Sequence, residues 1–135
     1  MTQDELNNYH LLMKKIATLE CQITSLRQNI HVGSPNMDGL PHGSGISDRT
    51  GNLAIEITDL EERLEYQRKK AKESEPEIRD FVNGIDDDIT RLVFKFRVMY
   101  GYSWSEVADT LGGYNTKGSV RARYMNFMKN DEETA

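Results

Sequence analysis

The sequence predicts an all-α protein in which an antiparallel coiled-coil hairpin is followed by a helix-turn-helix. Apolar residues recur at alternating steps of three and four in two long segments, which is the heptad spacing of paired helices. A stretch rich in glycine and proline separates these segments and supplies the turn of the hairpin. The last third of the chain contains a capping box, a glycine turn and a basic segment, in the order found in a helix-turn-helix.

The first heptad segment runs from residue 9 to residue 30 and contains no glycine or proline. Its stripe consists of Tyr9, Leu12, Ile16, Leu19, Ile23, Leu26 and Ile30. The period-two alternation of a strand is absent, so the stripe predicts a helix that packs along one side, either within the chain or against a partner. Cys21 falls outside the stripe and is expected to be exposed.

The second heptad segment follows a loop predicted over residues 32–51, which is either an ordered crossing or mobile. Asn52 is a candidate N-cap for the helix after this loop. The heptad stripe then continues at Leu53, Ile57, Leu60, Leu64, Gln67 and Ala71. Residues 1–75 are therefore expected to form the hairpin.

A second unit is expected over residues 76–130, followed by an acidic tail at residues 131–135. Ser74 and Glu77 have the spacing of a capping box, and Pro76 suits the first turn of a new helix. Three carboxylates at residues 86–88 satisfy N–H groups at the start of the next helix; a metal site there lacks the further oxygen ligands of a calcium loop. The residues expected to face inward are Ile78, Phe81 and Val82 in one helix and Ile89, Leu92, Val93, Phe96 and Met99 in the next.

The predicted helix-turn-helix begins at a second capping box, Ser103 with Glu106. Gly112 and Gly113 end the short helix, because glycine readily adopts positive φ. Thr116 is a candidate cap for a third, longer helix. The side chains expected to face inward are Trp104, Val107, Ala108 and Leu111, then Val120, Tyr124, Phe127 and Met128.

The third helix is the candidate DNA-binding element. Residues 113–130 contain four basic residues and no acidic ones, whereas the whole chain has a net charge of −5. Such a local basic patch suits contact with phosphates, and arginine also binds guanine in the major groove. The candidate DNA-binding residues are Thr116, Lys117, Ser119, Arg121, Ala122, Arg123, Asn126 and Lys129.

The composition argues against several other classes of protein. A sequence pI of about 5.2 argues against a non-specific coat on nucleic acid, and a single cysteine excludes an intramolecular disulfide and favours the cytoplasm. The polar start lacks a signal peptide, and no apolar run approaches the ~18 residues of a membrane span. The histidines have no metal-binding spacing. We therefore expect no enzymatic activity, no cofactor, no metal and no membrane contact.

The residues from Gly101 to Gly112 resemble region 4 of sigma factors, in which a small turn precedes a helix reading E-[IV]-A-x-x-L-G. Residues 116–123, TKGSVRAR, are similar to the recognition helix of that region, [ST]-x-x-[ST]-V-[KR]-x-R. The turn between Leu111 and Val120 is about two residues longer than in most sigma factors, which changes the expected angle between the two helices. The resemblance implies a sigma-like helix-turn-helix that binds promoter DNA.

The whole chain also resembles small phage and prophage transcriptional regulators of Gram-positive bacteria, of the ArpU/RinA kind. The shared features are the heptad part, a loop like Leu40–Asp48 and the terminal unit. This resemblance implies a regulator in the cytoplasm of a bacterial host, with double-stranded DNA as its partner and host RNA polymerase or a second copy of the chain as a further one. The alternatives are a DNA-packaging adaptor like a small terminase subunit and a protein that binds polymerase or sigma factor without DNA.

Overall fold

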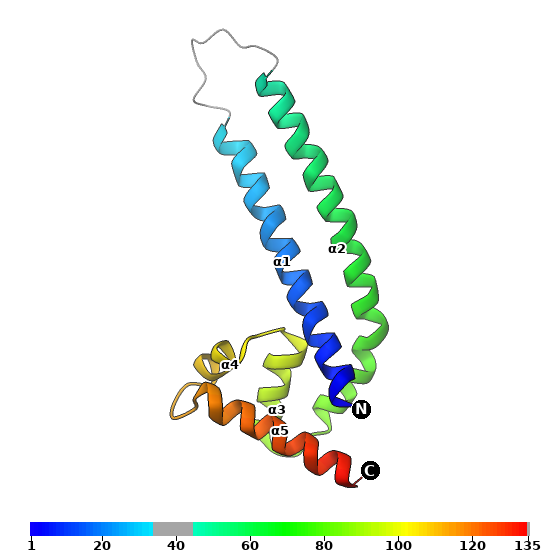
Figure 1. The fold of residues 1–135 in the computed structure, drawn as a ribbon, viewed down its shortest axis with the longest axis vertical. Helices are drawn as coiled ribbons and strands as arrows, with labels where there is room; N and C mark the ends of the chain where they lie inside the picture. Colours follow the sequence, from blue (N-terminus) through cyan, green and yellow to red (C-terminus); the bar gives the residue numbers. More distant parts are fainter. Residues whose placement is uncertain (34–44, 135) are drawn as a thin grey trace. The chain divides into compact units, whose positions relative to one another are not determined.

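The computed structural model describes the backbone of residues 1–33 and 45–134 and the side chains of residues 1–30 and 49–133. Every element in these ranges is helical, which confirms the all-α prediction (Figure 1). The elements are α1 (Gln3–Gly33), α2 (Gly45–Asn83), α3 (Asp88–Phe94), a π-helical turn η2 (Lys95–Met99), α4 (Trp104–Leu111) and α5 (Lys117–Thr134). None of these described helices combines the length and the apolar character needed to cross a bilayer.

The chain divides into two compact units, and α1 and α2 contribute to both. The paired-helix unit comprises Ile16–Arg68, and the terminal unit comprises Met1–Lys15 together with Lys69–Ala135. The start of α1 thus belongs to the same unit as α3, α4 and α5. The heptad pattern alone does not indicate this, because the same stripe runs through Tyr9 in one unit and Ile16 in the other.

In the paired-helix unit, α1 and α2 lie side by side and run in opposite directions (Figure 1). Two ion pairs join them, Arg27 with Glu61 and Arg68 with Glu20, the latter at 2.7 Å. A step of seven residues back along α1 matches a step of seven forward along α2, so both pairs belong to one antiparallel register. The expected stripe positions in this unit are buried or half-buried, with Ile16, Ile23, Ile57 and Leu64 buried.

Helix α2 is longer at both ends than the sequence predicts. It begins at Gly45, so Asn52 lies inside it and is not its N-cap, while residues 34–44 of the expected loop are outside the described residues. The break expected at residues 74–77 is also wrong, because α2 continues through Pro76 to Asn83. The buried stripe explains this continuity: Leu64, Ala71 and Ile78 follow one another at heptad spacing across the proline.

The core of the terminal unit is built around Phe94, which is fully buried. Its ring stacks on Tyr124 with centroids 4.5 Å apart and meets Phe127 edge-on at 5.1 Å. Phe81, at the end of α2, packs against both phenylalanine rings. The aromatic cluster therefore joins α2, α3 and α5.

The buried face of α3 differs from the expected one. Ile89 and Leu92 are 39% and 36% exposed, whereas Thr90, Phe94 and Val98 are buried together with the correctly predicted Val93. The large ring of Phe94 enters the core, and the buried face of α3 is therefore shifted by one residue from the face that the sequence predicts. The π-helical turn that follows, closed by a hydrogen bond from Tyr100 N to Lys95 O at 3.1 Å, adds a residue per turn and shifts the face again.

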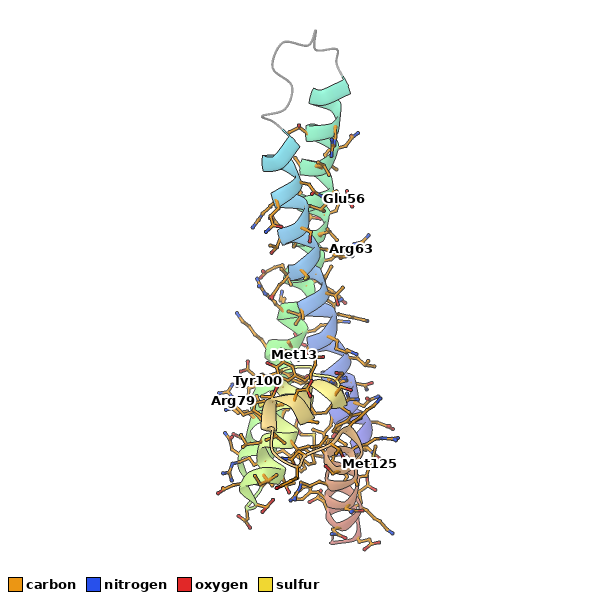
Figure 2. All side chains as sticks on the ribbon, turned by 90° about the vertical axis from the view of Figure 1, so that its left-hand side faces the viewer. Met13, Glu56, Arg63, Arg79, Tyr100 and Met125 are labelled. Carbon is orange, nitrogen blue, oxygen red and sulfur yellow. The ribbon has the colours of Figure 1, made fainter. Side chains whose placement is uncertain are left out.

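Gly101 marks a close contact between the start of α1 and the chain after η2. Its φ is +74°, and a Cβ there would lie 3.1 Å from Met13 Cβ and from Lys14 N. Figure 2 labels Met13 and Tyr100, the residue before Gly101, in this part of the unit. At the other end of the unit, residues 131–134 of the expected acidic tail continue α5 as helix.

Candidate nucleic-acid interface

Helix α4 begins at the capping box that the sequence predicts. Ser103 Oγ accepts a hydrogen bond from Glu106 N at 3.2 Å, and Ser103 N donates to Glu106 Oε1 at 3.1 Å. The hydrogen bonds from Ser103 hold the pKa of Glu106 below its usual range. Val107 and Ala108 are buried, and the small Ala108 suits the close contact of α4 with α5.

The turn between α4 and α5 is formed by two glycines in the left-handed region. Gly112 and Gly113 have φ of +69° and +64°. Asn115 closes the turn, because its backbone N and its side-chain amide both donate to Gly112 O, at 3.3 and 2.9 Å. The turn therefore has a defined hydrogen-bonded geometry.

Helix α5 starts with a reciprocal pair of hydrogen bonds. Ser119 N donates to Thr116 Oγ1 at 3.1 Å, and Thr116 N donates to Ser119 Oγ at 2.8 Å. This confirms Thr116 as the cap. Further along the helix, Val120, Tyr124 and Met128 are buried, which fixes the side of α5 that packs against the rest of the unit.

All eight residues predicted to contact DNA are exposed: Thr116, Lys117, Ser119, Arg121, Ala122, Arg123, Asn126 and Lys129. A helix turns by about 100° per residue, so Ala122, Asn126 and Lys129 lie opposite the buried side. Arg121 and Arg123 are separated by about 200° and therefore lie on opposite flanks of this face. The small and polar residues form its centre, and the arginines form its two edges.

Arg123 is held by the start of α3. Its Nη1 donates to Asp87 Oδ2 at 3.1 Å and lies 3.4 Å from Thr90 Oγ1. Asp87 is the N-cap of α3 and accepts hydrogen bonds from Thr90 N and Thr90 Oγ1, at 2.9 and 2.7 Å. These bonds to Thr90, and the charge of Arg123, lower the pKa of Asp87. One edge of the α5 face is thus fixed in position and partly neutralised.

Two of the three carboxylates at residues 86–88 act in capping and ion pairing in this structure. Asp87 caps α3, and Asp88 pairs with Arg91 on the same helix. In the part of the chain that the structure describes, no group of three His, Cys, Asp or Glu side chains has a geometry suited to a metal ion. The residues of this segment are used to start α3 and to position Arg123.

Sequence reasoning missed two features of this surface. The link from Asp87 and Thr90 to Arg123 spans distant parts of the sequence, and only the packing of α3 on α5 brings them together. Tyr114, in the turn, is fully exposed beside the start of α5. The sequence does contain a signal for this exposed ring, because an aromatic residue between Gly113 and Asn115 lies in a turn, where a large ring is not needed for packing.

Searches of protein-family models, of curated proteins and of solved structures find no match to this chain.

Proposed function

We propose that this chain is a DNA-binding transcriptional regulator in which α4, the glycine turn and α5 act as a helix-turn-helix. The observation that carries the proposal is the outward face of α5 over residues 117–130, which is free of acidic residues and lies opposite a well-packed buried side. The acidic residues Glu132 and Glu133 follow at the end of the helix. In this class of protein the second helix enters the major groove, and its side chains contact base edges. Helix α5 is the second helix here.

The charge distribution supports contact with phosphates. Residues 113–130 contain Lys117, Arg121, Arg123 and Lys129 and no carboxylate, within a chain of net charge −5. Cations that neutralise phosphates release counterions, and this release supplies much of the affinity of such proteins. The acidic remainder of the chain repels DNA and so favours one orientation of docking.

The sizes of the side chains support close approach to a groove. Gly118, Ser119 and Ala122 are small and exposed, and they lie near the middle of the outward face. A helix with small residues there brings its backbone near the bases, while Arg121 and Arg123 extend from its edges. Arginine binds guanine O6 and N7 with two hydrogen bonds, which gives sequence specificity.

The second part of the proposal concerns a protein partner. We interpret α1 and α2 as a coiled-coil hairpin and host RNA polymerase as the further partner, because a single helix-turn-helix buries a small interface on DNA. Ile89, Leu92 and Tyr100 are 39%, 36% and 46% exposed, and they add apolar surface to the terminal unit. A second attachment raises affinity through effective concentration.

The experiment first selects the DNA fragments that the protein binds from the genomes of a candidate phage and its bacterial host. The affinity of the protein for the selected fragments is then measured by fluorescence anisotropy. We expect the double variant Arg121→Glu, Arg123→Glu to lose binding. The matched control is Arg63→Glu, Lys69→Glu, which makes the same charge change at exposed positions on α2 (Figure 2 shows Arg63). Equal affinity of the two double variants would contradict the proposal.

A further inference from the structure

A hollow of about 290 Å³ lies in the terminal unit between α5, α4, η2 and the start of α1. The side chains that line it include Asp4, His10, Arg97, Trp104, Arg121 and Tyr124. Its volume is far larger than the ~30 Å³ of one water in the liquid, so a group of several heavy atoms fits. Two of its lining residues are arginines that come from different elements, η2 and α5.

Arg97 is a half-buried cation. Its Nη1 donates to Tyr102 O at 3.1 Å, and its Cζ lies 4.3 Å from the centre of the Trp104 ring. Among the described residues no carboxylate lies within ion-pairing distance of it. Burial lowers the pKa of Arg97, but a guanidinium remains charged at neutral pH. A partly desolvated charge without a counter-charge is unfavourable.

Arg121 adds a second positive charge beside the first. It is exposed, it forms no ion pair with any described carboxylate, and its charge also lowers the pKa of Arg97. Asp4 is the carboxylate that lines the hollow, so the site has two cations and one anion. An added anion would therefore compensate a net positive charge that the fold itself places there.

The neutral groups around the hollow also suit an anion. Burial raises the pKa of Tyr124 to about 12, so its hydroxyl stays protonated. His10 Nδ1 lies 2.6 Å from Arg97 O, a contact in which the ring nitrogen donates to the carbonyl. That hydrogen bond holds the backbone of η2 where Arg97 enters the hollow.

We propose that this hollow binds a phosphate group through the guanidinium groups of Arg97 and Arg121. The planar fork of arginine matches phosphate oxygens with paired hydrogen bonds. The phosphate belongs either to the backbone of DNA or to a free phosphorylated molecule. The site rests on its own geometry, and only its assignment to a DNA phosphate rests on the proposed function. Its position on one edge of α5 makes the DNA backbone the favoured source.

The single tryptophan makes binding directly measurable. Trp104 is the only tryptophan in the chain, and it lines the hollow and packs on Arg97. Inorganic phosphate is added to the full chain at constant ionic strength, with chloride as the compensating anion. We expect a saturable change in tryptophan fluorescence. Equilibrium dialysis with labelled phosphate measures the same binding without the optical signal, and the absence of saturable binding in both would overturn the proposal.

Variants identify the site. Arg121→Gln changes an exposed side chain and should weaken phosphate binding by about tenfold or more, since a hydrogen bond to a charged group is lost. Arg97→Lys keeps the positive charge but loses the planar guanidinium group, so it should also weaken phosphate binding. Arg63→Gln, on the exposed side of α2, is the matched control and should bind like the wild type. Equal affinity of Arg121→Gln and Arg63→Gln would overturn the site.

A DNA titration then assigns the source of the phosphate. If the group belongs to DNA, inorganic phosphate competes with DNA, and Arg121→Gln lowers the slope of log affinity against log salt by about 0.9. If it belongs to a free molecule, phosphate saturates the hollow while DNA affinity and its salt slope stay the same. Because phosphate binding is measured without DNA, failure of the anion site and failure of DNA binding are separate results.

Discussion

Arg123 Nη1 donates to Asp87 Oδ2 at 3.1 Å, and this ion pair joins the flank of α5 to the N-cap residue of α3. Both side chains are largely exposed, so solvent screens the pair and its contribution to stability is small. Its larger effect is on charge, because it places a carboxylate beside one of the arginines proposed to contact DNA.

Replacing Asp87 with asparagine should strengthen DNA binding. Asparagine also caps helices well, so α3 keeps its start while the charge beside Arg123 is removed. We expect an increase in affinity of about twofold to fivefold, the range that a surface ion pair supports. Asp86→Asn makes the same charge change without touching Arg123 and should have less effect. Weaker binding by Asp87→Asn would show instead that Asp87 positions Arg123 for DNA.

Pro76→Ala should stabilise the protein if α2 is one continuous helix. Proline inside a helix lacks the N–H and clashes with the carbonyl four residues earlier, at a cost of ~3 kcal/mol or more. Pro76 is exposed, so alanine there disturbs no core contact. Thermal unfolding should show a higher midpoint. An unchanged or lower midpoint would favour the alternative in which Pro76 begins a separate helix.

Gly101→Ala should be clearly more destabilising than Gly112→Ala. Both glycines have positive φ, which costs a non-glycine residue roughly 1–2 kcal/mol. A Cβ at Gly101 would also lie 3.1 Å from Met13 Cβ, whereas nothing lies within 4 Å of one at Gly112. Urea unfolding of the two variants measures the difference. Equal losses would contradict the packing of residues 1–15 on the chain after η2.

Acidification should destabilise the protein through His10. Burial lowers the pKa of His10 from the ordinary 6.5, so the unfolded chain binds a proton that the folded chain does not. This contribution to stability is present above about pH 6.5 and is lost as the pH falls through the folded pKa. The carboxylates Asp87 and Glu106 titrate at lower pH, because both have lowered pKa values.

The measurement is the thermal midpoint of the wild type and of His10→Asn at about pH 7.5 and pH 5.5. Asparagine keeps a donor for the Arg97 carbonyl but does not titrate. His10→Asn should have a lower thermal midpoint than the wild type at about pH 7.5, and its midpoint should fall by less when the pH is lowered to about 5.5. An equal loss in both proteins would exclude His10 as the source.

Local signals in the sequence predicted the local parts of the structure. The capping box of Ser103 and Glu106 and the cap at Thr116 depend on residues three apart, and both are found as expected. The heptad stripe correctly identified Ile16, Ile23, Ile57 and Leu64 as buried. These features require no knowledge of distant contacts.

The errors arose where tertiary packing overrides local preference. Pro76 has the sequence pattern of a helix start, but the buried residues on either side of it, Ala71 and Ile78, keep α2 continuous. Phe94 rotates the buried face of α3, and the π-helical turn has no simple sequence pattern. The contacts of Arg123 with Asp87 and of Arg97 with Trp104 were missed for a different reason. They depend on how α3 meets α5 and on how η2 meets α4, and residue spacing within one helix carries no information about that.

The most direct test of the central claim places a carboxylate in the middle of the outward face of α5. Ala122 is exposed and points away from the core, so Ala122→Asp should fold normally. Its matched control is Ala54→Asp, at an exposed position on α2. We predict that Ala122→Asp lowers affinity for the selected DNA by about tenfold or more, since the new charge faces the bases and phosphates, while Ala54→Asp binds like the wild type. DNA binding that is equally strong in both variants would contradict the claim that α5 reads DNA.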